Sequence, residues 1–213
     1  MINKNTKVYC SFAKKAGNVG CKIFNSAFNY YGMDKIYKSF SINNIEDAID
    51  AVKTLDIKGF AVTMPFKVEV IDYLDELDSS VQSIGAVNTV INDNGYLIGY
   101  NTDYLAAKEV LDECLGIDLY ILGNGGYSRA VQQAAKDLGY KPKMISRSNW
   151  KDIKNIKHSI VYNCTPVKNI KVDKSNEFID CIVSTPTGKK LSWIQASHQF
   201  KLYTGKELPI RSI

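Results

Sequence analysis

The chain has 213 residues, of which 45% are hydrophobic and 23% charged, as in an ordinary soluble globular protein of one or two small domains. Its net charge of +5 comes from scattered lysines rather than a basic block, which argues against nucleic-acid binding and favours an anionic small molecule or cofactor. The five cysteines form no CxxC pair and there are two histidines, so we expect no metal site. Without an apolar signal core or a membrane-length run, the sequence predicts a cytoplasmic protein with reduced thiols and no membrane partner.

The first 78 residues alternate between strand and helix patterns. The first helix pattern ends at Gly32, and the second has acidic residues near its start and Gly59 near its end. In chain order we expect a strand at 8–12, a helix at 21–32, a strand at 35–42, a helix at 44–59, a strand at 59–64 and, after Pro65, a helix at 68–77. This alternation predicts an α/β fold with a mainly parallel sheet covered by helices.

Residues 85–103 have the pattern of a β-hairpin. Two strand-like segments, AVNTVI and YLIGY, flank an Asp-Asn-Gly sequence that is a strong hairpin signal. A predicted helix at 104–116 leads away from the hairpin, and a predicted strand at 118–122 begins a second β-α-β pattern. The change of pattern predicts a domain boundary near Asp103.

A glycine-rich turn joins the strand at 118–122 to the next helix. Gly123 and Gly125 stand where the turn must be tight and where backbone N–H groups can approach a pyrophosphate at the helix N-terminus. The third position of this dinucleotide-binding motif is Ser128, which is small enough for helix–strand packing. We therefore assign cofactor binding to the turn, formed by Gly123, Asn124, Gly125, Gly126, Tyr127 and Ser128.

The end of the following strand predicts which dinucleotide binds. An acidic residue there would hold a free ribose 2′-hydroxyl, but the chain has Ser146, Arg147 and Ser148 instead. An arginine flanked by hydroxyl groups suits a 2′-phosphate and favours NADP over NAD. The alternative is that Arg147 is an ordinary surface residue after a strand.

Three polar residues lie at the ends of predicted sheet elements. Lys67 follows a strand, Asn88 lies in the first hairpin strand, and Asp103 follows the second. A lysine beside a carboxylate can take the hydroxyl proton while hydride leaves carbon, as a dehydrogenase requires. A structural ion pair or solvated surface charges would explain the same residues, and the spacing alone does not choose between these interpretations.

Four motifs, VTMPFK, GAVNTV, GYNTD and GNGGYSRA, resemble the shikimate dehydrogenase family in their order and intervals. The N-terminal stretch AGNVGCKIFNSAFNYYGMDKIYKSF is most similar to its divergent shikimate dehydrogenase-like subgroup. The resemblance implies NADP-dependent interconversion of 3-dehydroshikimate and shikimate, in aromatic amino acid biosynthesis. It also implies a substrate-binding and catalytic domain at 1–103, a reduced Rossmann-like NADP domain at 104–190, and a C-terminal helix at 191–213 that returns to the substrate domain.

The resemblance also implies roles for individual residues. Lys67 matches the catalytic lysine and Asp103 its partner. The expected substrate contacts are Asn18, Thr63, Asn88 and Gln195. Thr165, in an Asn-Cys-Thr-Pro loop, and Gly188, at a glycine near the nicotinamide, complete the expected cofactor site.

Three departures separate the chain from the family pattern. Where the family carries a Ser-x-Ser grip for the substrate carboxylate, the chain has Asn18 and Gly20, and Ala61 replaces an expected asparagine. Because unmatched buried polar groups are costly, these changes should alter or weaken shikimate recognition. About ten residues between Trp150 and Ile160 stand where the family has a further helix and strand, and another helix–strand step is missing between Pro186 and Leu191. We therefore expect weaker NADP binding or a chain stabilised as a homodimer. Two alternatives remain open, a non-catalytic NADP- or metabolite-binding relative and a quinate or aminoshikimate dehydrogenase.

Overall fold

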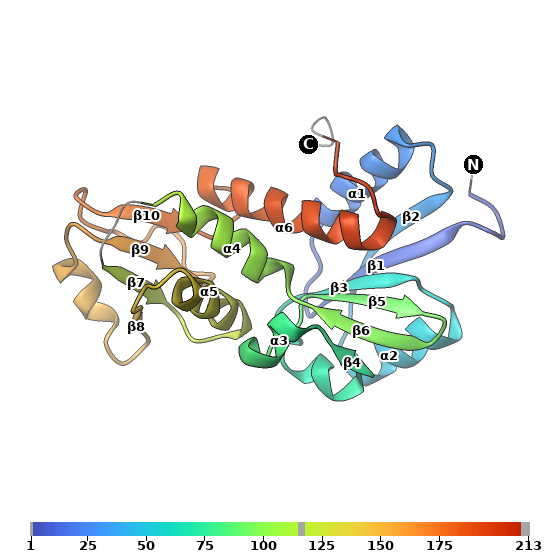
Figure 1. Ribbon diagram of the computed structural model, residues 1–213, viewed down its shortest axis with the longest axis horizontal. Coiled ribbons are helices and arrows are strands. Elements are labelled where there is room, and N and C mark those ends of the chain that lie inside the picture. Colours follow the sequence, from blue (N-terminus) through green and yellow to red (C-terminus); the bar gives the residue numbers. More distant parts are fainter. Residues whose placement is uncertain (1, 115–117, 210–213) are drawn as a thin grey trace. The chain divides into compact units, whose positions relative to one another are not determined.

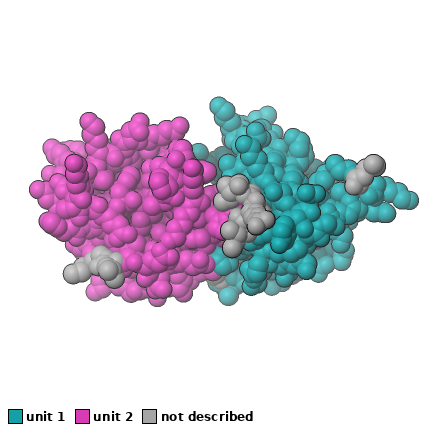
Figure 2. All heavy atoms as spheres, turned by 90° about the horizontal axis from the view of Figure 1, so that it is seen from above, with its two compact units in different colours: residues 1–102, 196–213 teal, residues 103–195 magenta. Residues whose placement is uncertain are grey.

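The computed structural model describes residues 2–114 and 118–209. The chain divides into two compact units, coloured separately in Figure 2. The first unit contains the described residues up to Thr102 together with those from Ala196 onward, and the second contains the described part of Asp103–Gln195. Helix α6 (Pro186–Thr204) therefore begins in the second unit and ends in the first.

A six-stranded mixed sheet forms the centre of the first unit (Figure 1). Its strand order is β2-β1-β3-β5-β6-β4; β1, β2 and β3 run parallel, and β5 is antiparallel to both β3 and β6. The strands are β1 (Lys7–Ala13), β2 (Lys35–Ser41), β3 (Gly59–Val62), β4 (Glu76–Leu77), β5 (Thr89–Asp93) and β6 (Tyr96–Tyr100). The expected parallel arrangement of the first three strands is confirmed.

The two faces of this sheet carry different side chains because successive residues of a strand point to opposite sides. Phe12, Phe60 and Val62 belong to a core on the side of helix α2 (Ile45–Thr54). Helix α1 (Val19–Tyr30) packs through Phe24 and Phe28 against Phe200 of α6, within an aromatic cluster. Asn44 caps α2 by accepting the Glu46 N–H at 2.8 Å.

The helix expected at 68–77 is wrong. Residues Glu69–Tyr73 form only a short 3-10 helix (η1), and the strand β4 follows at once. Asp75 explains the change, because its N–H donates to the Leu97 carbonyl at 3.0 Å and its carboxylate accepts the Leu97 N–H at 2.7 Å. Pairing with β6 thus replaces a second helical turn. The helix α3 (Ser79–Ile84) comes next and was not expected.

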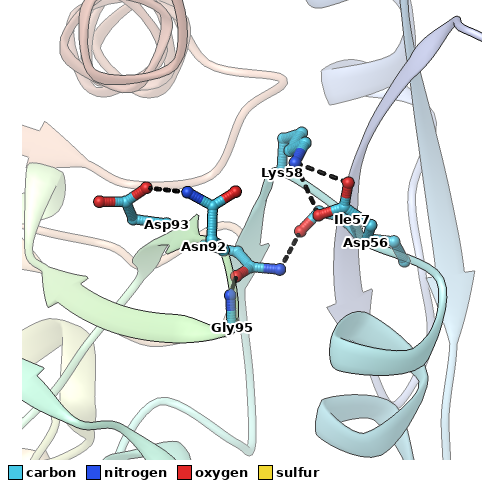
Figure 3. Close-up of polar contacts among 7 residues, drawn as sticks. Asp56, Ile57, Lys58, Asn92, Asp93 and Gly95 are labelled. Atoms are coloured by element: carbon cyan, nitrogen blue, oxygen red, sulfur yellow. Dashed lines mark hydrogen bonds and ion pairs between the residues drawn. The ribbon is translucent and has the colours of Figure 1, made fainter.

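The predicted hairpin is confirmed in β5 and β6. At its turn Asn94 and Gly95 have φ values of 54° and 95°, the left-handed conformation that an Asn-Gly pair accepts in a two-residue hairpin loop. Figure 3 shows that Asn92 stabilises the turn from its side chain: Oδ1 accepts the Gly95 N–H at 2.7 Å, and Nδ2 donates to the Ile57 carbonyl at 2.9 Å. The register of the hairpin is therefore fixed by both the turn and its neighbour β3.

The second unit is a reduced Rossmann-like domain. Its four strands are all parallel in the order β10-β9-β7-β8, with helices on the sheet and apolar cores on both faces. Its elements are α4 (Thr102–Asp112), β7 (Leu119–Leu122), α5 (Gly126–Asp137), β8 (Lys143–Ile145), the 3-10 helix η2 (Trp150–Asn155), β9 (Ile160–Asn163) and β10 (Glu177–Asp180). The expected α/β class is confirmed. The short 3-10 helix η2 occupies the stretch after Trp150 in which the sequence lacked a further helix and strand.

The described residues include neither a membrane-spanning helix nor a metal-binding cluster. No helix there is long and apolar enough to cross a bilayer, and no group of three or more histidine, cysteine, aspartate or glutamate side chains is arranged to hold a metal ion.

Candidate functional site

The loop after β3 positions Lys67. The Thr63 N–H donates to the Phe12 carbonyl at 3.0 Å, and the Phe66 N–H donates to the Thr63 carbonyl at 2.9 Å, with the Phe66 side chain buried. The Lys67 carbonyl in turn accepts the Val87 N–H at 2.7 Å. The half-buried Lys67 is therefore anchored through its backbone beside the segment that leads into Asn88.

Asn88 is the centre of a buried hydrogen-bond network. Its Oδ1 accepts the Thr102 N–H at 2.8 Å and the Thr89 hydroxyl at 2.9 Å, and its Nδ2 donates to Thr102 Oγ1 at 2.9 Å. The carbonyl oxygen of the side chain is thus occupied within the protein, while an amide nitrogen carries a second N–H. Through Thr102, Asn88 fixes the first residue of α4, and Asp103 follows directly.

Gln199 extends this network from helix α6. Its Nε2 donates to the Thr89 hydroxyl at 2.8 Å, and its side chain is buried. Thr89, Thr102 and Gln199 were not expected from the sequence. The first two lie within the motifs, next to Asn88 and Asp103, and Gln199 lies one helical turn after Gln195, so proximity to these residues was the available signal. The Gln195 Nε2 donates to the Ser192 carbonyl of its own helix at 3.2 Å.

Asp103 is the first residue of the second unit and lies in the first turn of α4. Its side chain is buried. Burial raises the pKa of both Tyr127 and Tyr162 well above the usual value, and the Asp103 charge adds to this effect. The two phenols are hydrogen-bonded to each other at 2.9 Å. Asp103 therefore acts electrostatically on a pair of neutral phenols in its own unit.

A row of small side chains crosses the first unit's sheet near the carboxyl ends of β1, β2 and β3. Ser39 pairs with Ser11, Ser11 with Ala61, and Ala61 with Thr89. The Ser11 hydroxyl donates to Ser39 Oγ at 3.0 Å. Ligands of open α/β sheets bind beyond the carboxyl ends of parallel strands, so this row faces the region where a substrate is expected. Ala61 is its apolar member, at the position where the sequence had led us to expect an amide.

The start of helix α1 carries the other sequence-predicted substrate contact. Asn18 occupies the N-cap position, is exposed, and makes no side-chain cap. The first turn of α1 contains no acidic residue, so the positive end of the helix dipole is not neutralised by its own sequence. A Cβ atom at Gly20 would lie 2.9 Å from Cε1 and 3.3 Å from the hydroxyl oxygen of Tyr37. This arrangement leaves the N-terminal end of α1 able to accept an anion.

The glycine-rich turn of the second unit has the geometry of a phosphate site. Gly123 has a φ of +105°, and a Cβ there would lie 2.8 Å from Thr165 Cγ2, so the turn needs glycine for both conformation and space. Gly125 caps α5 without a side chain, and a Cβ at Gly125 would meet nothing within 4 Å. Ser128 donates to the Gly123 carbonyl at 2.8 Å, which closes the turn. The helix N-terminus therefore faces open space.

The loops after β8 and β9 flank this turn. The Ser146 N–H donates to Asn149 Oδ1 at 2.7 Å, the Ser146 and Ser148 hydroxyls are 2.9 Å apart, and Arg147 between them is exposed. Thr165 donates its hydroxyl to Asn163 Oδ1 at 2.7 Å. Because the strand order changes direction between β7 and β9, the turn and Thr165 lie at the topological switch point of the sheet.

An open cavity of about 320 Å³ lies between η2 and the loop after β9. Its lining is strongly basic, with lysines from both segments and one indole ring: Trp150, Lys151, Lys154, Lys168 and Lys171. A cavity with this lining favours an anionic ligand group.

Gly188 has a structural reason to be glycine. It is the third residue of α6, and a Cβ atom there would overlap the carbonyl group of Ile182. Its N–H donates to the Thr185 hydroxyl at 3.1 Å. The start of α6 therefore packs directly on the segment after β10. A role beside a nicotinamide stays a prediction.

Comparison with known sequences gives consistent matches. The profile described as the shikimate dehydrogenase substrate binding domain matches residues 18–90. A shikimate dehydrogenase-like protein of Haemophilus influenzae is 38% identical over 154 residues, covering 71% of this chain and 57% of that protein. The NADP(+) shikimate dehydrogenase of Pyrococcus furiosus is 41% identical over 136 residues, covering 62% and 50%. The matched stretch thus spans about half the length of these curated relatives.

Solved structures match over nearly the whole chain. A shikimate 5-dehydrogenase-like protein superposes with a TM-score of 0.84 at 30% identity, covering 100% of this chain and 96% of that one. A shikimate dehydrogenase in complex with NADP+ gives a TM-score of 0.80 at 28% identity, covering 100% and 94%. With the motifs, the reduced Rossmann-like unit and these matches together, the chain belongs to the shikimate dehydrogenase family, with its divergent shikimate dehydrogenase-like members among its relatives.

Proposed function

We propose that the chain is an NADP-dependent oxidoreductase that interconverts 3-dehydroshikimate and shikimate, or a close cyclic hydroxy acid, by hydride transfer. The observation that carries the proposal is the buried clamp of Asn88 on Thr102, which fixes the start of α4 and with it the backbone of Asp103. Relatives at about 40% identity bear the name NADP(+) shikimate dehydrogenase.

Lys67 and Asp103 provide the acid–base chemistry of this proposal. In the oxidation direction the Lys67 amine takes the proton of the reacting hydroxyl, and in reduction its ammonium group returns that proton. We assign to Asp103 the role of partner to Lys67 in this acid–base pair, as the family resemblance implies. The anchored backbone of Lys67 supports the role, because proton transfer requires a defined position.

The remaining polar residues bind the substrate. Asn88 uses its second N–H, and Thr63 its hydroxyl, for ring hydroxyl groups, and Gln195 contributes an amide. Asn18 at the start of α1 takes part in holding the carboxylate, supported by the unneutralised helix N-terminus.

The second unit fits a dinucleotide, as judged from its own geometry. The open α5 N-terminus at Gly125 leaves room for a pyrophosphate, while Gly123, Asn124, Gly126, Tyr127 and Ser128 form the turn around it. Ser146, Arg147 and Ser148 hold a 2′-phosphate, and Thr165 and Gly188 border the nicotinamide side. The bound NADP supplies the hydride acceptor or donor.

The basic cavity supports NADP over NAD. One side of the cavity is formed by η2, which comes shortly after Arg147 in the sequence. The lysines that line the cavity add positive charge to the same unit. Such positive charge attracts a phosphate monoester more strongly than it attracts a free hydroxyl group. The weaker cofactor binding expected from the shortened sheet stays a prediction.

The proposed reaction is tested by following NADPH absorbance with the purified chain and shikimate, quinate and aminoshikimate in turn. We expect NADP-dependent turnover on shikimate or one of its two analogues. Saturable NADP binding without turnover on any of the three would contradict the enzyme assignment and support a non-catalytic NADP-binding relative. Turnover confined to NAD and quinate would contradict the cofactor assignment.

We further propose a cytoplasmic homodimer. The described cysteines are all free thiols, as in a reducing compartment. The dimer is proposed because the cofactor domain, with its four-stranded sheet, is shortened. Light scattering of the purified chain is expected to give twice the mass of 23.8 kDa, and the monomer mass would contradict the dimer.

A further inference from the structure

The space beside Gly20 is filled by a tyrosine from another element. Tyr37 comes from β2, and its ring tip lies where a side chain at residue 20 would stand: a Cβ there would be 2.9 Å from Cε1 and 3.3 Å from the hydroxyl oxygen. The missing side chain at Gly20 and the phenol of Tyr37 are therefore two parts of one packing arrangement. The sequence showed the absence at Gly20 but could not show what replaces it.

Tyr37 cannot leave this position easily. Its ring stacks on Phe24 of α1, with centroids 4.5 Å apart, and the residue is 4% exposed. Its backbone is held from both sides by one side chain, because Asn25 Oδ1 accepts the Tyr37 N–H at 2.7 Å and Asn25 Nδ2 donates to the Tyr37 carbonyl at 2.8 Å. These bonds also cover the edge of the sheet at β2. The position of the phenol tip is thus set by packing and by hydrogen bonds.

The Ser11 side chain is hydrogen-bonded to the Tyr37 phenol. Ser39, two residues after Tyr37 on the same strand face, is hydrogen-bonded to Ser11, and Cys21 Sγ of α1 lies 3.2 Å from Ser39 Oγ. Burial raises the pKa of Tyr37 well above its usual value, with the Ser11 hydroxyl acting in the opposite direction. The phenol therefore keeps its proton at neutral pH and remains a hydrogen-bond donor.

The surroundings suit a carboxylate. Gly20 is partly exposed and lies in the first turn of a twelve-residue helix that has no acidic residue there. Resting on the proposed function, we propose that Tyr37 is a specificity-determining residue, whose hydroxyl donates a hydrogen bond to the carboxylate of the cyclic hydroxy acid in place of a side chain at residue 20. A phenol donor on β2 reaches the carboxylate from the sheet, whereas a residue-20 side chain would reach it from the helix.

The test compares Tyr37→Phe with the unmodified chain for binding of shikimate and of its methyl ester by titration calorimetry. A hydrogen bond to a charged group is lost only for the acid, so the Kd of shikimate should rise about tenfold or more while the Kd of the ester stays within about twofold. Tyr96→Phe, at the exposed start of β6 in the same unit, is the matched control and should change neither value.

Equal changes for acid and ester, or no change for either, would overturn the assignment. Ser11→Ala provides a second variant should Tyr37→Phe fail to fold: the Ser11 side chain is hydrogen-bonded to the Tyr37 phenol, so its removal should weaken shikimate binding selectively, and an unaltered preference would again overturn the assignment. A chain that binds shikimate without turning it over contradicts the proposed reaction but leaves this comparison intact. A chain that binds no shikimate contradicts both.

Discussion

The two units make their polar sites in different ways. In the first unit, side chains from distant segments form a buried network, in which Asn88, Thr89, Thr102 and Gln199 are hydrogen-bonded to one another. In the second, the backbone of a glycine turn and exposed cations face open space. A cyclic polyol needs several fixed partners, whereas a phosphate needs N–H groups and positive charge. For the proposed function, the difference means that substrate selectivity would depend on the packing of side chains, and cofactor binding on backbone conformation and positive charge.

The largest effect is expected at Lys67. Lys67→Ala should lower kcat by about 10²- to 10⁴-fold, because it removes the group proposed to transfer the hydroxyl proton. Lys58→Ala is the matched control, since Lys58 lies in the same unit and pairs with Asp56 at 2.6 Å (Figure 3). Steady-state kinetics of the two variants checks this, and substantial turnover by Lys67→Ala would contradict the assignment.

Substitutions at two glycines of the second unit should distinguish an effect on stability from an effect on cofactor binding. Gly188→Ala should destabilise the protein by about 3 kcal/mol, because its methyl group overlaps the Ile182 carbonyl. Gly125→Ala should leave stability within about 0.5 kcal/mol, since its Cβ meets open space, but should weaken NADP binding at the turn. Denaturant titration and NADP titration measure the two effects. A stable Gly188→Ala variant would show that the start of α6 is not closely packed.

The buried network is tested at Asn88. Asn88→Ala leaves the Thr102 N–H without its acceptor and should lower the free energy of unfolding by about 1–3 kcal/mol. Asn94→Ala, at the hairpin tip, makes a poor comparison because of its positive φ, so Asn5→Ala on the exposed N-terminal turn serves as control. Equal stability of the Asn88 and Asn5 variants would contradict a structural role for the network.

A smaller effect is expected at Arg147. Arg147→Ala should raise the Kd of NADP about tenfold and leave that of NAD nearly unchanged, because the charge acts on the 2′-phosphate alone. Fluorescence titration with both dinucleotides provides the measurement. The same increase for both would show that Arg147 is not the selecting residue.

Local sequence patterns predicted the elements whose conformation depends on residues adjacent in the chain. The hairpin followed from Asn94 and Gly95, whose conformations are those of a two-residue turn, and α5 followed from the glycine turn before it. The helix predicted after Pro65 was wrong because Asp75 is hydrogen-bonded to Leu97, a residue far along the chain. That strand pairing overrides the helical periodicity of the sequence.

The candidate site was only partly predictable for the same reason. Motifs pointed to Lys67, Asn88 and the glycine turn, but nothing in the sequence connects Gly20 with Tyr37 or Gln199 with Thr89. These pairs meet through packing between elements. Sequence therefore identified the residues that carry the family motifs, and the structure identified the neighbours that pack and hydrogen-bond with them.

The proposed NADP-dependent reaction is tested most directly by measuring kcat/KM for shikimate with NADP and with NAD. We predict NADP-dependent oxidation of shikimate by the unmodified chain, a value at least about tenfold lower with NAD, and loss of both rates in Lys67→Ala. Saturable NADP binding with no oxidation of shikimate, quinate or aminoshikimate would contradict it.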